Sequence, residues 1–366
     1  MGRIRICRVE DLPDLARLHQ KAFGHNTGMP RVSLDYLCSH YDKLLFNHPW
    51  ADESYPSLVY EGSDEGIIGF LGVIPRPMYL EQRAVTCAIA ARLMVDPAHR
   101  SPFAAIELLR TYLSGRQDIS YTDGATMTAR RVWETLGASL VPLLSIKWAR
   151  IVKPLHLAVA TRSWSEARSR ASILLTAPGD AVAGSVSPFR VEDPALTTRP
   201  LSVPGLLAAL EADAGRYTLR PVHTEATLEW LIDFMADDPD RGKLVTDEVL
   251  DEDGKPIGWY AFFSEPGGVC EVVNMSTDPK THRRVLSQLI FRAKQDGGLA
   301  IQGRMLPRHL DDYWESGCFG KRSGWALIQT GDTELRRAVM EGDAYLQGLE
   351  GEMPFPLQRR PAPGRL

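Results

Sequence analysis

The sequence has few cysteines, and none of them stands in a pair typical of a metal or redox motif. The five are scattered along the chain: Cys7, Cys38, Cys87, Cys270 and Cys318. An odd number without a C-x-x-C pair predicts neither a disulfide framework nor a cysteine zinc site. No other metal-ligand spacing, Walker loop, dinucleotide-binding glycine fingerprint or nucleophile elbow is present, so we expect no metal cofactor.

Long apolar runs and an excess of basic charge are also missing. No segment is long enough to span a membrane, and residues 1–8 alternate charged and apolar side chains where a signal peptide needs an uninterrupted apolar run. We therefore expect a cytoplasmic protein with no membrane partner. The net charge of −4 argues against nucleic acid as a partner. The chain has 366 residues, 44% of them hydrophobic and 24% charged, which suits a globular protein of two domains.

The most informative stretch covers residues 93–110. A short apolar strand ends at the pair Asp96-Pro97, and a helix with leucines at helical spacing begins a few residues later. The loop between them opens on Arg100. A loop that leads into a helix N-terminus is suited to bind phosphate, because unpaired N–H groups and the positive end of the helix dipole face the anion.

This arrangement resembles the pyrophosphate loop of the GNAT superfamily of acyl-CoA-dependent N-acyltransferases. In that family a strand ending in L-x-V-x-P-x-x-R leads into R-G-x-G-x-A. Arg100 and Ala105 match the first and last positions of the loop, whereas Ser101 and Phe103 replace its glycines. We expect Phe103 to pack under the loop, because the residues after it, starting with Ala104, make the helix start apolar.

A second stretch, residues 126–137, is similar to the family pattern N-x-x-A-x-x-L-Y-E-K-L-G. Thr126 can cap this helix as asparagine would. Trp133 replaces the tyrosine that protonates the departing thiolate in many members, and an indole cannot do so. We interpret Trp133 as a core residue.

The resemblance implies acetyl-CoA or another acyl-CoA as co-substrate and an amine on a small molecule or peptide as acceptor. The residues that it places against the cofactor are Leu93, Met94, Val95, Arg100, Ser101, Phe103, Ala104, Ala105 and Thr126. For the general base, Asp123 at the end of the neighbouring strand is the best candidate, although its other interpretation is a turn residue before Gly124. His19 and Glu61 are weaker candidates, each interpreted as a solvated surface group.

The order of elements in residues 1–150 is typical of a GNAT lobe: strand, helix, antiparallel hairpin, strand, helix, strand, helix and a closing strand through residues 146–148. A second pattern begins with a strand at residues 217–221, and its loop at residues 281–287 has no glycine. Tyr313 falls where the acid tyrosine belongs in this second lobe. A helix over residues 163–175 and a linker over residues 177–200 connect the two.

We thus predict an α/β (mixed α+β) protein of two GNAT-like lobes, each a mixed, mostly antiparallel sheet flanked by helices. The boundaries are 1–150 for the acyl-CoA-binding lobe, 151–215 for the linker and connecting helices, 216–335 for the degenerate lobe and 336–366 for a C-terminal helix and tail. The predicted function is N-acyl transfer, with acetyl as the first choice of acyl group. Two alternatives stay open: a pseudo-acyltransferase that serves as a binding scaffold, and an aminoacyl transferase that uses aminoacyl-tRNA.

Overall fold

The structure, a computed structural model, describes residues 2–23, 32–62, 66–99, 102–160, 176, 178–180, 182, 184, 189–238, 241–322 and 324–355. The expected helix over residues 163–175 lies outside these ranges, as do residues 177, 181, 183 and 185–188 of the expected linker. The described strands are β1 (Arg3–Ile6), β2 (Leu58–Gly62), β3 (Gly66–Leu80), β4 (Arg83–Val95), β5 (Ile119–Ala125), β6 (Ser139–Leu140), β7 (Ile146–Ile151), β8 (Thr197–Pro200), β9 (Leu219–Pro221), β10 (Lys243–Leu250), β11 (Pro256–Ser264), β12 (Val269–Met275), β13 (Ala300–Arg304), β14 (Phe319–Arg322) and β15 (Trp325–Gln329).

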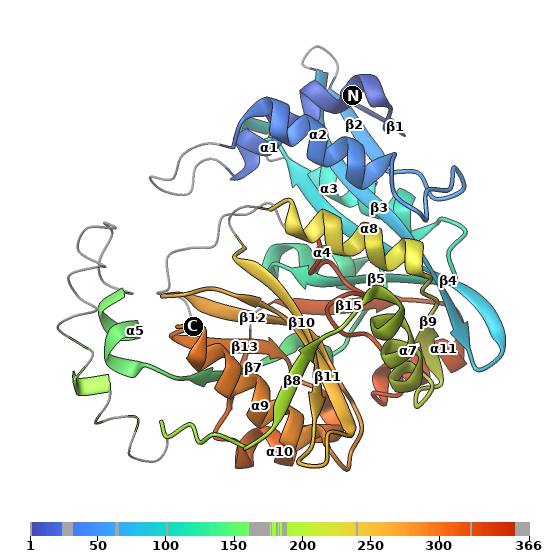
Figure 1. The fold of residues 1–366 in the computed structure, drawn as a ribbon. Helices are drawn as coiled ribbons and strands as arrows, with labels where there is room; N and C mark the ends of the chain where they lie inside the picture. The colour runs from blue at the N-terminus through green and yellow to red at the C-terminus, as the bar shows by residue number, and fades with distance from the viewer. Residues whose placement is uncertain are drawn as a thin grey trace.

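Along the chain the helices connect these strands, and in space helices cover both sheets (Figure 1). They are η1 (Val9–Asp11), α1 (Leu12–Phe23), α2 (Leu34–Leu45), η2 (Pro97–His99), α3 (Pro102–Leu113), α4 (Met127–Thr135), η3 (Leu143–Ser145), α5 (Pro154–Ala160), α7 (Val203–Ala214), α8 (Glu225–Ala236), α9 (His282–Gln295), η4 (Pro307–His309), α10 (Leu310–Glu315) and α11 (Thr333–Met340). Among the described residues, no helix is long and apolar enough to cross a membrane.

Two mixed sheets form the framework, as the sequence predicts. The first has the order β1-β2-β3-β4-β5-β15-β6, with β9 paired to the far end of β3, and the second has the order β14-β7-β13-β12-β11-β10-β8. In each sheet one pair of strands is parallel, β4 with β5 and β12 with β13. Each parallel pair is joined through a helix, α3 or α9, because parallel strands need a crossover connection.

The two sheets exchange strands, and this corrects three expectations. The strand at residues 146–148 does not close the first sheet: β7 pairs with β13 and β14 in the second. In return β15 lies between β5 and β6 of the first sheet. Residues 217–221 do not start the second sheet either, because β9 pairs with β3, and the edge beside β10 is taken by β8 from the expected linker. A strand pattern in sequence fixes the residue type of each face but not the partner strand.

The alternation of apolar residues along the strands builds three layers of core. In the first sheet Leu71 and Ala88 face α3 and α4, while Phe70 and Ile89 face α1 and α2. This second face continues into a shared core that also contains Phe263 of the second sheet. The outer face of the second sheet packs against α9 and α10. The two sheets therefore enclose one common interior.

The C-terminal segment, residues 345–355, runs through this common interior. Tyr345, Leu349 and Phe355 belong to the shared core, with exposed fractions of 1%, 3% and 1%. Buried arginines hold its backbone, since Arg76 donates to the carbonyl oxygen of Leu349 at 3.1 Å and Arg92 to that of Phe355 at 2.7 Å. The expected tail is therefore, as far as Phe355, an internal element.

Candidate active site

The first sheet opens at one end, where β4 and β5 separate. These strands are parallel and pair only from Cys87 with Ile119 to Ile89 with Tyr121, although β4 continues to Val95 and β5 to Ala125. Beyond this point the facing edges of the two strands are not paired with each other. A wedge of this kind leaves backbone donors and acceptors available to an extended ligand that enters between the strands.

A bulge in β4 lies in the wedge. The pairing with β3 shifts between Phe70–Met94 and Gly72–Ala91, so Arg92 and Leu93 stand opposite one residue, and Arg92 has a φ of 61°. A left-handed backbone conformation is uncommon for a residue with a Cβ. β-Bulges are over-represented next to active sites. A Cβ on Gly72 would lie 2.7 Å from the Ala91 carbonyl oxygen, which explains the glycine opposite the bulge.

The loop after β4 is anchored by Asp96. Its carboxylate accepts a hydrogen bond from the Ala98 backbone at 2.9 Å and pairs with Lys21 of α1 at 2.8 Å. The two predicted loop residues Arg100 and Ser101 lie outside the described residues. The chain then enters α3, whose first turn lies near the end of β4, because Gly69 contacts Ala104 and pairs with Val95. The predicted order of strand, loop and helix is therefore present.

The first residues of α3 differ in their environment. Ala104 is 2% exposed and lies against Gly69 of β3, where a Cβ would be 3.7 Å from that of Ala104. Ala105 is half-buried. Phe103 is 66% exposed, so the expectation that it packs under the loop is wrong. One residue corresponds to about 100° around the helix, which turns Phe103 outward when Ala104 faces the sheet.

The second family-like stretch forms α4 as predicted. The Thr126 hydroxyl caps this helix by accepting a hydrogen bond from the Ala129 backbone at 3.2 Å. Trp133 is 2% exposed and meets Tyr112 of α3 edge-on, with ring centroids 5.9 Å apart. Its interpretation as a core residue is confirmed.

Asp123, the predicted base, lies on β5 inside the wedge and joins the two sheets. Its carboxylate forms an ion pair with Arg304 of β13, and the side chains are 3% and 11% exposed. Arg304 also donates to the Leu144 carbonyl oxygen at 2.7 Å. Asp123 lies at the position predicted from the sequence, and its ion pair with Arg304 links β5 of the first sheet to β13 of the second.

A second carboxyl, Glu352, reaches the same place from the C-terminal segment. It accepts hydrogen bonds from the Thr122 hydroxyl and from the backbone of Asp123 at 3.2 Å and Gly124 at 3.1 Å. Its own backbone donates to the Asp123 carboxylate at 2.9 Å. Desolvation, followed by the negative charge of Asp123, raises the pKa of Glu352 to about 7. The sequence analysis missed this residue, and the only local signal is the run Glu350-Gly351-Glu352, in which two carboxyls flank a glycine.

Gly351 explains how the segment comes so close to β5. A Cβ at this position would lie 2.1 Å from an Asp123 carboxylate oxygen, a separation that no side chain tolerates. The glycine therefore lets the backbone of the C-terminal segment pass directly over Asp123, which places Glu352 beside it.

The other face of β4 carries a buried hydrogen-bonded chain. Tyr41 of α2 lies 2.9 Å from His19 Nδ1 and donates to the Met94 sulfur at 3.6 Å. His19 is 4% exposed, and burial lowers its pKa to about 3. The interpretation of His19 as a solvated group is therefore wrong, because the ring fills space between two helices. Glu61 forms ion pairs with Arg3 and Arg5 of β1, away from the wedge.

The second sheet contains an equivalent wedge, which the C-terminal segment closes. Pairing of β12 with β13 ends at Glu271 and Gln302, and beyond it the side chain of Gln347 bonds both the N–H and the C=O of Met275, each at 3.1 Å. Gly348 donates to the Val273 carbonyl oxygen at 3.1 Å.

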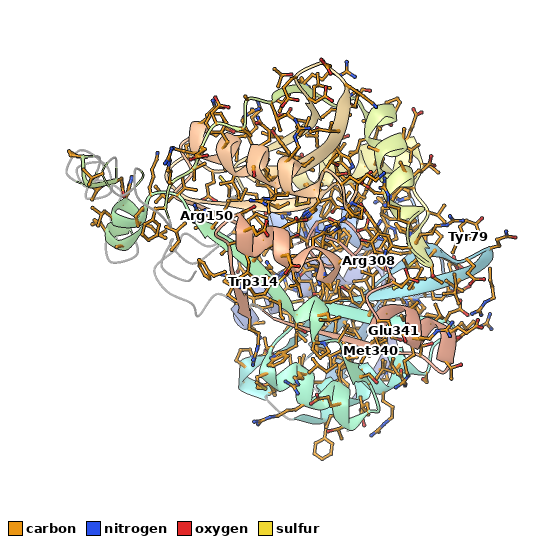
Figure 2. The ribbon with its side chains drawn as sticks, turned by 90° about the horizontal axis from the view of Figure 1, so that it is seen from below. Tyr79, Arg150, Arg308, Trp314, Met340 and Glu341 are labelled. Carbon is orange, nitrogen blue, oxygen red and sulfur yellow. The ribbon has the colours of Figure 1, made fainter. Side chains whose placement is uncertain are left out.

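Tyr313, the predicted acid of the second lobe, is 0% exposed and stacks on Trp148, with ring centroids 5.4 Å apart. Burial raises its pKa strongly. It belongs to the core between α10 and the second sheet and is not brought together with Asp123. Its neighbour Trp314 is on the outside of α10, 58% exposed (Figure 2).

Comparison with known proteins identifies this fold. No protein-family model and no curated protein sequence matches the chain, but solved structures do. A probable N-acyltransferase from Enterococcus faecalis superposes with a TM-score of 0.56 at 12% identity, over 93% of this chain and 74% of that one. A GCN5-related N-acetyltransferase from Anabaena variabilis gives 0.58 at 14% identity, over 92% and 75%.

Saccharomyces cerevisiae N-myristoyltransferase with bound myristoyl-CoA is similar too, with a TM-score of 0.55 at 12% identity over 89% of this chain and 82% of that one. The chain therefore has the two-lobed GNAT-like fold that these acyltransferases share, and the predicted fold class is confirmed. At this identity the likeness concerns the fold, and function must be argued from the site.

Proposed function

We propose that the protein is an N-acyltransferase that binds acyl-CoA in the first lobe and transfers the acyl group to an amine. The observation that carries this proposal is the wedge between β4 and β5 beside the N-terminus of α3. An extended pantetheine chain can pair with the open edge of β4, around Leu93, Met94 and Val95. The pyrophosphate would then lie at the start of α3, where N–H groups and the helix dipole attract phosphate.

Glu352 is the residue that we propose as the general base. Direct attack on a thioester needs a free amine, and the amine must lose a proton during the reaction. A carboxyl with a pKa of about 7 is matched to this task near neutral pH. Burial, followed by the negative charge of the neighbouring Asp123, raises the pKa of Glu352 to this value. Asp123 thus acts as a positioning residue for Glu352.

The acetyl group is our first choice of acyl group, and a small molecule or a peptide supplies the amine. The myristoyltransferase likeness makes a longer acyl chain the specific alternative. A panel of acyl-CoA thioesters of increasing length, tested in competition for binding, distinguishes the two.

The test of the donor site is calorimetric titration with acetyl-CoA. We expect one site per chain, because the wedge of the second sheet is filled by Gln347 and Gly348. Arg100→Ala should weaken binding by about 1.5–3 kcal/mol through loss of a charge-assisted hydrogen bond to phosphate. Arg110→Ala, on the exposed side of α3, is the matched control and should bind as the wild type does. Equal affinity of both variants would remove the proposed pyrophosphate site, and absence of binding would favour the scaffold alternative.

A further inference from the structure

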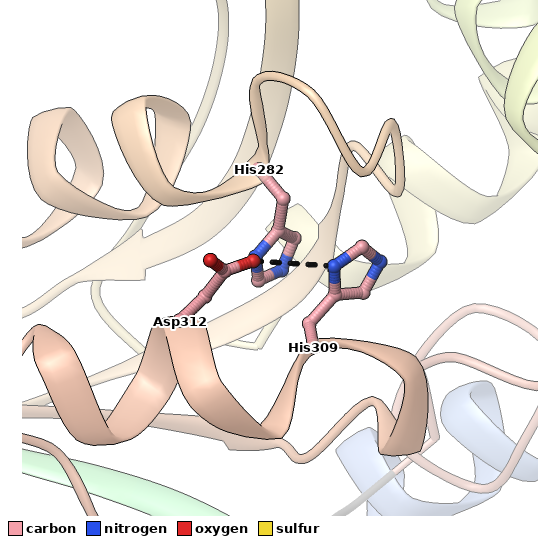
Figure 3. A group of neighbouring side chains, drawn as sticks. All are labelled: His282, His309 and Asp312. Atoms are coloured by element: carbon pink, nitrogen blue, oxygen red, sulfur yellow. Dashed lines mark hydrogen bonds and ion pairs between the residues drawn. The ribbon is translucent and has the colours of Figure 1, made fainter.

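Two histidines and an aspartate meet where the second lobe has its counterpart of the acyl-CoA loop. His282 is the first residue of α9, the helix that follows β12 as α3 follows β4. His309 ends η4, and Asp312 lies one turn later on α10. Figure 3 shows the two imidazoles side by side with the Asp312 carboxylate at their edge.

The donor atoms of the three side chains converge. An Asp312 carboxylate oxygen lies 2.9 Å from His282 Nδ1 and 3.3 Å from His309 Nδ1, and one ligand atom from each residue lies within 4.8 Å of the others. In a tetrahedral zinc site, with bonds of about 2.0–2.1 Å, ligand atoms are separated by roughly 3.3 Å. The spacing on both sides of the carboxylate is close to this value.

Burial distinguishes this cluster from a surface group of polar residues. The side chains of His282 and His309 are 0% and 2% exposed, whereas that of Asp312 is 24% exposed. Among the residues that the structure describes, His282 Nε2 has no hydrogen-bond partner. The cluster therefore consists of two buried imidazoles beside a carboxylate that is partly accessible to solvent.

Hydrogen bonding accounts for only one nitrogen of each ring, because His282 Nε2 and His309 Nε2 have no partner among the described residues. Both Nδ1 atoms lie beside the same carboxylate oxygen, and the rings stack with centroids 3.8 Å apart and planes 14° apart.

We propose that His282, His309 and Asp312 form a binding site for a divalent metal ion of the zinc class. The N₂O donor set suits Zn²⁺ and Co²⁺ better than Mg²⁺ or Ca²⁺, which prefer oxygen ligands. Because the two rings are nearly parallel, one of them must turn about its Cβ–Cγ bond so that one nitrogen of each ring can bind the same ion. Water would complete the coordination at the exposed side of Asp312. The ion ties the start of α9 to α10.

This site is independent of the proposed acyl transfer, which uses the first lobe. A metal site at the start of α9 is consistent with the lack of glycine in residues 281–287, because no phosphate has to approach the backbone there. The sequence analysis expected no metal, since the separation of 27 residues between His282 and His309 matches none of the familiar ligand spacings.

The experiment is metal titration of the full-length protein after dialysis against a chelator. Co²⁺ is the probe, because tetrahedral coordination gives visible absorption bands, and Zn²⁺ should displace it at one ion per chain. Zn²⁺ should also raise the melting temperature, since an ion that binds only the folded state stabilises it.

Asp312→Asn removes the carboxylate ligand while keeping the shape of the side chain, and Asp311→Asn removes the same charge from the exposed neighbour. We expect Asp312→Asn to weaken Co²⁺ binding by about 100-fold or more, beyond the 10–100-fold that outer-shell changes cause, and Asp311→Asn to bind normally. Equal binding by the two variants, or a wild-type protein without a Co²⁺ spectrum and with unchanged melting in Zn²⁺, would overturn the proposal.

Discussion

Replacing Glu352 with glutamine should change how the stability of the protein depends on pH. In the folded protein its carboxyl holds a proton up to about pH 7, whereas in the unfolded chain it loses the proton near the ordinary value of 4.5. The folded state therefore binds more protons between these two pH values, and the free energy of unfolding falls as the pH rises through this interval.

The magnitude follows from the two pKa values. A change from 4.5 to about 7 makes the contribution of Glu352 about 2.5 kcal/mol smaller at pH 8 than at pH 5. Glutamine carries no proton to lose, so this part of the pH dependence should vanish in Glu352→Gln. Relative to the wild type, the variant should gain about 2.5 kcal/mol on going from pH 5 to pH 8.

Urea unfolding of both proteins at a series of pH values measures this difference directly. Glu341→Gln, at an exposed position after α11, is the control and should keep the wild-type pH dependence. A difference between wild type and Glu352→Gln that stays constant with pH would refute the reasoning. The same variant tests the proposed base: acyl transfer should fall by about 10²–10⁴-fold while acetyl-CoA affinity stays close to that of the wild type.

Two further substitutions test the packing around the site. Gly351→Ala should destabilise the protein by about 1–3 kcal/mol in urea unfolding, because the new Cβ would lie 2.1 Å from the Asp123 carboxylate. The control Gly331→Ala should have little effect, because a Cβ there meets nothing within 4 Å. Phe103→Ala should cost no more than about 0.5 kcal/mol because the ring is mostly exposed, whereas Leu108→Ala, at 0% exposure, should cost about 2–5 kcal/mol; similar losses in thermal melts would contradict the outward position of Phe103.

The sequence could predict the parts of the site that are local in the chain. The strand that ends at Val95, the helix after the loop and the cap at Thr126 each follow from a few neighbouring residues, and the structure contains all three. The sequence predicts that this helix begins near Ala104, whereas α3 begins at Pro102. The core position of Trp133 follows in the same way from helical spacing. Phe103 was misjudged although it is local, since an apolar start of a helix does not say which residue of the turn faces the sheet.

The sequence could not predict which sheet each strand joins. β7 and β15 both have the apolar alternation of core strands, and nothing in that alternation identifies a partner far away in the chain. Consecutive strands usually pair with each other or lie as neighbours, so placing residues 146–148 in the first sheet was the natural choice. The structure departs from this rule, because β15 pairs with β5 in the first sheet while β7 pairs in the second.

Glu352 could not be predicted for a related reason. Its pKa depends on desolvation and on Asp123, which is more than two hundred residues away in the chain. Both effects arise only when the C-terminal segment enters the common interior.

The C-terminal segment, residues 345–355, makes opposite contributions to the two wedges. In the second sheet Gln347 and Gly348 occupy the open edge of β12, which is why we propose a single acyl-CoA site per chain. In the first sheet, within the part of the chain that the structure describes, no backbone hydrogen bond joins residues 345–355 to β4, and the same segment brings a titratable carboxyl to β5. In the function that we propose, one lobe binds the donor and the other holds the segment that carries the base. That arrangement depends on the course of these eleven residues, 345–355, between the sheets.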